Sequence, residues 1–214
     1  WSPMRSLCFY LICMLLIGMA RAQNPGFTAL KNPEPFKLAF NDAAKTTNSI
    51  KSDFIQEKNL SMLADKIISK GKFWFKKENR VRMEYTHPFA YLMILNGGRI
   101  YVKDGQKENK ISAGSGKVFR QVNRLLLDCV GGTIFSNPDF HTRILESPKA
   151  YLIELQPVAK NLAALYQKIN IFIDRKDYSA SAIDMFEVSG DNSSIRFLNK
   201  ELNANIPDTL FTIP

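Results

Sequence analysis

The sequence predicts a mainly β protein with a few helices (α+β), in which one strongly curved antiparallel sheet forms an incomplete β-barrel. Two observations predict it. About ten short segments carry apolar residues at every second position, with turn residues between them at intervals of about 8–15 residues. Two further stretches follow helical spacing instead. Because a sheet with one apolar face must cover that face, we expect an N-terminal helix and a helical lid over the concave side.

We interpret residues 1–22 as a cleavable secretory signal peptide. Arg5 gives a positive start, an apolar run follows at Leu7–Ile17, and Ala20 and Ala22 form the small-x-small pattern of a cleavage site. The apolar run is shorter than the about 20 residues of a comfortable membrane span, which makes an N-terminal anchor the less favoured alternative. The sequence therefore predicts export.

Charge and cysteine content narrow the class of protein further. The chain holds 29 Lys and Arg against 20 Asp and Glu, and removal of the two arginines of the signal peptide lowers the net charge from +9 to +7. Cys129 is then the one cysteine left, so no internal disulfide supports the fold. A positive net charge of this size is consistent with binding to nucleic acid, with binding to an anionic membrane surface, or with solubility alone. Since an exported protein rarely meets nucleic acid, we predict none and assign the basic residues to a solvated outer face, at Lys72, Lys76, Arg80 and Arg82.

After the signal peptide we predict a flexible, proline-punctuated leader at residues 23–35 and a single domain over residues 36–214. A helix fits Phe36 to about Asn48, since its apolar residues fall roughly on one face. The clearest strands are Lys70–Lys76 and Arg80–Tyr85, in which apolar and basic residues alternate. Their apolar side chains share one face of the hairpin: Phe73, Phe75, Val81, Met83 and Tyr85.

The remaining strands are predicted from the same alternation. Two of them flank Asn96-Gly97-Gly98, whose residues tolerate the positive φ of a hairpin turn. In chain order these strands are Tyr91–Leu95, Arg99–Lys103, Phe140–Glu146, Tyr151–Gln156, Tyr166–Asp174, Ser181–Val188 and Ser194–Asn199.

A stretch between Gly116 and Gly131 breaks this pattern with helical spacing and an apolar face. Glycines on both sides give the stretch freedom to move, so we predict a lid whose opening exposes an apolar surface of lipid size. The predicted inner face of the lid consists of Phe119, Val122, Leu125 and Leu126.

Motifs that carry catalysis are lacking in the sequence. The two histidines, His87 and His141, have no cysteine or acid at the spacing of a metal site. Cys129 falls on the apolar face of the predicted lid, where an inert thiol is usual. No nucleophile elbow occurs. We therefore predict no metal, no cofactor and no enzymatic activity.

Three stretches of the first half carry a resemblance: Asp53–Gln56, Gly71–Tyr85 and Ile94–Tyr101. They resemble the periplasmic outer-membrane lipoprotein carrier family (LolA-type), whose pattern is F-x-Q, then a G-x-(L/F)-W strand, then a hairpin with Gly. Residues 206–214, at the end of the chain, resemble the C-terminal pattern of the family more loosely. Where the family's turn has Arg-Pro-Asn, this chain has Lys77-Glu78-Asn79. In the family that Arg helps hold the lid shut, so the resemblance implies that Lys77 holds the lid less rigidly, because Lys lacks the planar fork of Arg.

The resemblance implies a monomeric periplasmic carrier that binds acylated lipoproteins. It would receive them from an inner-membrane ABC-type exporter and release them to an outer-membrane acceptor. Our hypothesis is that the five apolar residues of the first hairpin line the floor of a lipid-binding cavity beneath the lid. Two alternatives stay open: a carrier of another lipid on the same fold, and a periplasmic adaptor that senses lipoproteins and signals to a partner.

Overall fold

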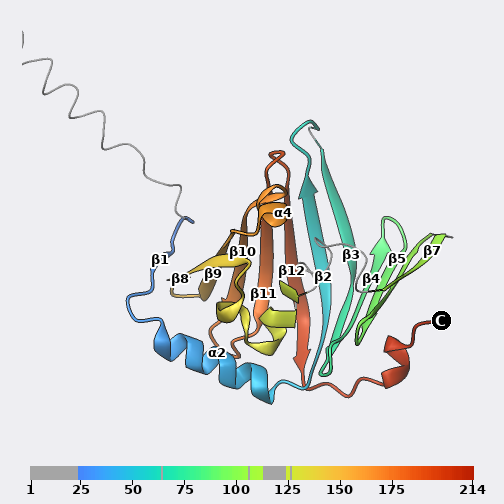
Figure 1. The fold of residues 1–214 in the computed structure, drawn as a ribbon, viewed down its shortest axis with the longest axis horizontal. Helices are drawn as coiled ribbons and strands as arrows, with labels where there is room; N and C mark the ends of the chain where they lie inside the picture. The colour runs from blue at the N-terminus through green and yellow to red at the C-terminus, as the bar shows by residue number, and fades with distance from the viewer. Residues whose placement is uncertain (1–23, 64, 106, 113–123, 126) are drawn as a thin grey trace, which may run out of the picture.

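The computed structural model describes residues 24–214 apart from residues 64, 106, 113–123 and 126. In this part of the chain twelve strands form one antiparallel sheet (Figure 1). The strands are β1 (Thr28–Ala29), β2 (Ser49–Asn59), β3 (Lys66–Lys76), β4 (Arg80–His87), β5 (Tyr91–Asn96), β6 (Arg99–Asp104), β7 (Lys107–Ser112), β8 (Phe140–Glu146), β9 (Ala150–Pro157), β10 (Tyr166–Asp174), β11 (Ala180–Glu187) and β12 (Asn192–Leu202). The helices are α2 (Glu34–Thr46), η1 (Ile134–Ser136), α4 (Lys160–Ala163) and η2 (Asp208–Phe211). Residues 124–125 and 127–131 are helical as well.

The sheet is open and bends around an interior. Its strand order is β1-β8-β9-β10-β11-β12-β2-β3-β4-β5-β6-β7, so the pairing of β12 with β2 joins the two halves of the chain. Among the described residues no pairing links β1 to β7. Figure 1 shows α2 across one end of the strands and the helical residues 124–125 and 127–131 in front of the sheet. The predicted fold class, a mainly β structure with helices and an incomplete barrel, is confirmed.

Helix α2 forms because its residues suit both its start and its buried face. Pro35 stands in the first turn, where its missing N–H costs no hydrogen bond. Phe36 and Phe40 are one turn apart and almost fully buried. The ring of Phe36 lies 4.4 Å from that of Tyr151, between ring centroids. The helix ends two residues earlier than predicted, where the Thr47 hydroxyl donates to the Ala43 carbonyl.

Residues 24–33, which belong to the predicted leader, contact the edge of the sheet. β1 pairs with β8, with Thr28 opposite Glu146. The ring of Phe27 packs on Phe172 at 5.7 Å between centroids, and the side-chain amide of Asn24 donates to Glu154. The prolines had indicated irregular backbone, but the partners that order this segment lie more than a hundred residues away in the chain.

All nine strands predicted from the sequence occur, and three others were missed. The longest of these, β2, lies in the centre of the sheet between β12 and β3. Its inward face carries Ile50, Ser52, Phe54 and Gln56. Because two of these side chains are polar, β2 lacks the regular apolar alternation by which the other strands were predicted. β1 has only two residues, and β7 alternates charges rather than apolar residues.

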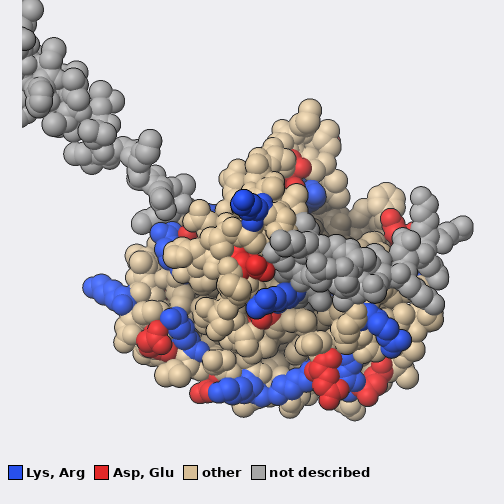
Figure 2. Space-filling view, viewed as in Figure 1, with Lys and Arg blue, Asp and Glu red and all other residues tan. Residues whose placement is uncertain are grey.

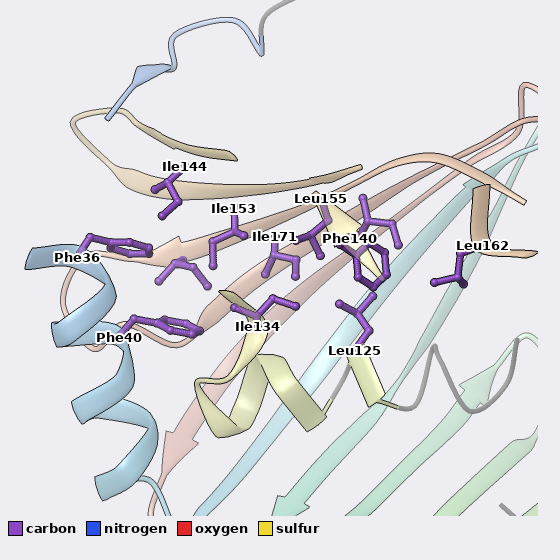
Figure 3. Packing of buried hydrophobic residues seen from close by; sticks show 12 residues of the cluster. Phe36, Phe40, Leu125, Ile134, Phe140, Ile144, Ile153, Leu155, Leu162 and Ile171 are labelled. Carbon is purple, nitrogen blue, oxygen red and sulfur yellow. The ribbon is translucent and has the colours of Figure 1, made fainter. Parts of the chain in front are cut away.

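Buried apolar side chains form two clusters, one in each half of the sheet. The first core, drawn in Figure 3, lies between α2, β8–β10 and the helical residues near Leu125. It consists of Phe36, Phe40, Leu125, Ile134, Phe140, Ile144, Ile153, Leu155, Leu162, Ile169, Ile171 and Ile173. The second core lies on β2–β6 and β12 and consists of Ile50, Phe54, Phe73, Phe75, Val81, Leu95, Ile100 and Ile195.

Three of the four basic residues predicted for a solvated outer face of β3 and β4 bind the C-terminal segment, which corrects their assignment to solvent. The fourth, Lys72, is exposed. Arg80 donates to the Asp208 carboxylate at 2.8 Å, and Arg82 donates to the Leu210 carbonyl at 3.1 Å. Lys76 donates to the Ile206 carbonyl and pairs with Asp208. Figure 2 shows Lys and Arg side chains interspersed with Asp and Glu side chains along the lower edge of this view. These contacts fix η2 against the outer side of β4 and β5.

Candidate functional site

A cavity of about 350 Å³ lies where the two cores meet. One wall comes from α2 and the first core, through Phe40, Ile169 and Ile171. The facing wall comes from the second core, through residues such as Ile50 and Phe73. Half-buried methionines at positions 83, 93 and 185 complete it. Because Met side chains are flexible and polarisable, they adapt to apolar guests of differing shape.

The structure places the five predicted floor residues on one face of the β3–β4 hairpin. Phe73 is opposite Met83 and Phe75 is opposite Val81, as the alternation requires. Phe73, Met83 and Tyr85 line the cavity. Phe75 and Val81 are packed within the second core, and Val81 is fully buried. The first three therefore face the cavity, and the other two support that wall.

Phe54 and Gly71, two positions that carry the sequence resemblance, have a physical role in this wall. The Phe54 ring lies against the backbone of Gly71, and a Cβ at that position would stand 2.5 Å from Phe54 Cζ. The same ring meets Tyr85 edge to face, with 4.9 Å between centroids. Tyr85 then donates its hydroxyl to Gln56 Oε1 at 2.7 Å. The F-x-Q pattern of β2 thus holds Tyr85 in place on β4.

Two tyrosines form one polar end of the cavity. Tyr85 and Tyr91 meet edge to face at 5.6 Å between centroids. Burial, and secondly the neighbouring Tyr91, raise the pKa of Tyr85 to about 12. Burial and the Asp104 carboxylate also raise the pKa of Tyr91. Both phenols are therefore neutral at physiological pH, so this end offers a guest hydroxyl groups without charge.

A charged pair marks the end of the cavity toward α2. The ammonium group of Lys200 and the carboxylate of Asp177 are 3.5 Å apart, and both residues line the cavity. Asp177 belongs to the β10–β11 turn, whose Tyr178 ring lies 6.0 Å from that of Tyr151, between centroids. A charged side chain in a mainly apolar wall requires a partner, because water solvates it poorly there.

Of the predicted lid, Leu125 lies within the described residues, whereas Phe119, Val122 and Leu126 lie outside them. Leu125 is 9% exposed and lines the cavity together with Cys129 and Val130. Burial, and secondly the Asp128 carboxylate, raise the pKa of the Cys129 thiol well above its usual range. The thiol is thus part of the apolar wall, and the movement of the lid stays a prediction.

Lys77 is exposed and its ammonium group donates to the backbone carbonyl of Lys45, in the last turn of α2. The described contact of Lys77 is therefore with α2. Its predicted contact with the lid would involve residues outside the described part of the chain.

Several residues of the cavity were not predicted as site residues, because the family pattern drew attention to the first hairpin. They belong to strands of the other half, β10–β12, and to β2. Alternation in β10 and β11 was a usable signal, since their apolar residues share one face. The missed wall residues include Ile50, Ile169, Ile171, Ile183, Met185 and Phe197.

The described residues include no group of three or more His, Cys, Asp and Glu side chains that could hold a metal ion. In the same part of the chain, none of the helices combines the length and apolar character needed to cross a membrane. The apolar cavity is a candidate binding site that the described residues present.

Comparisons with known proteins give a match to one family model and to several solved structures. A family model described as outer membrane lipoprotein carrier protein LolA matches residues 45–214. No curated protein sequence gives a significant match. An uncharacterized conserved protein from Thermus thermophilus superposes with a TM-score of 0.53 at 7% identity, covering 86% of this chain and 95% of that chain.

Two further solved structures are similar. A chain of the Pseudomonas aeruginosa MucA/MucB complex has a TM-score of 0.51 at 13% identity, covering 86% of this chain and 62% of that chain. A LolA superfamily protein from Nitrosomonas europaea has a TM-score of 0.44 at 14% identity, covering 83% of this chain and 97% of that chain. The Thermus and Pseudomonas structures share the fold of this chain.

Proposed function

Because the chain belongs to the outer membrane lipoprotein carrier protein LolA family, we propose that it is a periplasmic carrier that binds the acyl chains of lipoproteins and takes them from the inner to the outer membrane. One observation supports this proposal above others. The cavity joins both halves of the sheet, and its wall consists mainly of aliphatic, aromatic and Met side chains.

The physical chemistry of acyl chains suits such a wall. Transfer of each CH₂ from water to an apolar site is worth about 0.8 kcal/mol, so a long chain needs a host to cross an aqueous space. Ligand pockets typically measure about 300–1,000 Å³. At about 350 Å³ the described cavity is at the low end of that range, which suits one acyl chain. A bulkier lipoprotein anchor would require the cavity to widen, as the predicted lid allows.

The steps before and after binding belong to the same proposal. The chain loses its signal peptide on export, receives cargo from an inner-membrane ABC-type exporter, acts as a monomer, and releases cargo to an outer-membrane acceptor. It performs no catalysis, because the wall contributes burial rather than reactive groups. Release requires that opening of the cavity offset part of the free energy of burial.

Native mass spectrometry tests the proposal on protein purified from the periplasm without detergent. We expect a bound lipoprotein, recognised by the mass of its acylated N-terminal peptide after proteolysis. A free lipid in its place would favour a carrier of another cargo. Folded protein purified without any acyl-chain ligand, and unable to take one up from vesicles, would contradict the proposal.

The second candidate, a carrier of another lipid, is favoured by the Lys200–Asp177 pair in the wall. An acyl chain alone has no use for an ammonium group, whereas an amphiphile with a charged head does. The third candidate, an adaptor, draws on the fold shared with a chain of the MucA/MucB complex. Copurification of a protein partner that carries no lipid would favour the adaptor.

A further inference from the structure

Lys200 points into the cavity because of an irregularity in β12. Ile195 and Phe197 line the cavity, so simple alternation would place Asn199 inside and Lys200 outside. Between Leu198 and Glu201, however, β12 carries one residue more than its partner β2. This β-bulge shifts the alternation and brings Lys200 to the inner face.

Asn199 stabilises the bulge. Its φ of 51° lies in the left-handed region, which Asn adopts more readily than most residues. Its side-chain amide donates to Asp53 Oδ2 at 2.9 Å, across to the neighbouring strand. Because bulges re-aim side chains, the combination indicates that the inward direction of Lys200 is specified by the sequence around it.

The ammonium group of Lys200 keeps capacity to donate hydrogen bonds. Its side chain is only 14% exposed, yet its two described contacts are long, 3.5 Å to Asp177 Oδ1 and 3.4 Å to the Ala180 carbonyl. An ammonium group has three donors, and strong bonds to it measure about 2.7–2.9 Å. Lys200 therefore has room for a closer acceptor.

Asp177 has partners of its own and does not depend on Lys200. Its Oδ1 accepts hydrogen bonds from the backbone N–H of Ser179 at 2.9 Å and from the Ser179 hydroxyl at 2.6 Å. These bonds belong to the β10–β11 turn. A ligand that drew the ammonium group away would thus leave the Asp177 carboxylate hydrogen-bonded.

We infer that Lys200 is an anion-binding group at one end of the cavity, and that the cavity takes an amphiphile with a single acyl chain and an acidic head. The chain lies along the apolar wall toward the tyrosines, and the carboxylate or phosphate ester of the head binds the ammonium group. Poor solvation of a cation in this wall strengthens that bond. The inference rests on the proposed binding of acyl chains and specifies the ligand of the second candidate function, a carrier of a lipid other than a lipoprotein.

The test compares two probes that differ in the head alone, dodecanoate and dodecanol. Each displaces the neutral fluorescent probe N-phenyl-1-naphthylamine from wild type, from Lys200→Met and from Lys51→Met. Met approximates the length of the lysine side chain without its charge. Lys51 is the matched control, because it lies on the neighbouring strand, is exposed and pairs with Glu201. Thermal unfolding verifies that all three proteins are folded.

We expect wild type and Lys51→Met to prefer dodecanoate to dodecanol by about tenfold, the value of one charge-assisted bond. Lys200→Met loses the preference through weaker binding of dodecanoate, while its affinity for dodecanol is unchanged. Equal binding of both probes by wild type, or a preference that survives in Lys200→Met, would overturn the inference and leave lipid binding intact. Failure of wild type to bind either probe would instead refute the proposed function.

Discussion

The two cores of the sheet differ in composition and in what they face. The first core contains mostly Ile and Leu, closed on one side by Phe36 and Phe40 of α2. The second core has the same number of phenylalanines, three, among fewer residues, and is bordered by half-buried Met83, Met93 and Tyr85 along the cavity. Met185 packs against both cores. Both cores therefore contribute walls to the cavity, and the flexible Met side chains that border it pack mainly against the second core.

The difference separates stability from binding. Side chains enclosed on all sides lose dispersion contacts and leave a void when truncated. Side chains along a cavity already lack neighbours on one side, so their truncation costs less free energy of unfolding and changes the shape of the binding site instead. Substitutions in the two cores should therefore have different consequences.

The largest effect is expected from Ile153→Ala in the first core, where Ile153 is fully buried. The free energy of unfolding should fall by about 2–5 kcal/mol, measured by urea denaturation. Met83→Ala, at the cavity, should cost clearly less and alter the affinity for acyl chains. If the two substitutions destabilise equally, the distinction between the cores is wrong.

Gly71→Ala tests how tightly the second core is built where it supports the cavity. A methyl group there meets the Phe54 ring and the backbone carbonyl of Glu84, so β3 and β4 must move apart. We expect a loss of about 1–3 kcal/mol in the free energy of unfolding. Gly98→Ala is the control, because a Cβ at Gly98 meets no atom within 4 Å. A neutral effect of Gly71→Ala would show that the ring has room to move.

Tyr85→Phe removes one hydrogen bond at the polar end of the cavity and keeps the ring packing on Phe54. The expected loss in the free energy of unfolding is about 0.5–1.5 kcal/mol. Acyl-chain affinity should hold or rise, since the wall becomes more apolar. A clear loss of affinity in a lipid titration would indicate that the phenol binds the guest directly.

The smallest effect concerns the C-terminal segment on the outer face. The Lys76 hydrogen bond, followed by the charges of Arg80 and Lys76, lowers the pKa of Asp208 below its ordinary value of 3.8. A carboxyl whose pKa is lower in the folded protein stabilises it above its unfolded pKa, and this contribution is lost as pH falls through the folded pKa. Stability of the wild type should therefore fall further below about pH 4 than that of Asp208→Asn. Parallel acid titrations of the two proteins would contradict this.

Local alternation was enough to predict nine strands and the direction of Phe73, Met83 and Tyr85. It failed where polar residues stand on the inner face, as Ser52 and Gln56 do in β2. It also failed for Lys200, because the β-bulge in β12 reverses which residues face inward. The spacing of apolar residues in the sequence does not indicate where such a bulge occurs.

Long-range contacts limited the prediction in a second way. Arg80 and Asp208 are 128 residues apart in sequence, and each looks like a solvated charge on its own. Likewise, the strand that orders Thr28 begins at Phe140. Only the assembled sheet brings these partners together. The sequence alone therefore did not predict that the C-terminal segment covers the outer side of β4, or that residues 24–33 contact the edge of the sheet.

The most direct test of the central claim fills the cavity and measures acyl-chain binding. Ala43 lines the cavity on the inner side of α2, whereas Leu38 on the same helix is 64% exposed. Titration with cis-parinaric acid, a fluorescent fatty acid, compares wild type, Ala43→Trp and Leu38→Trp. Binding by wild type and Leu38→Trp, with most of it lost in folded Ala43→Trp, is the predicted result. Undiminished binding by folded Ala43→Trp would contradict the assignment of the cavity as the lipid site.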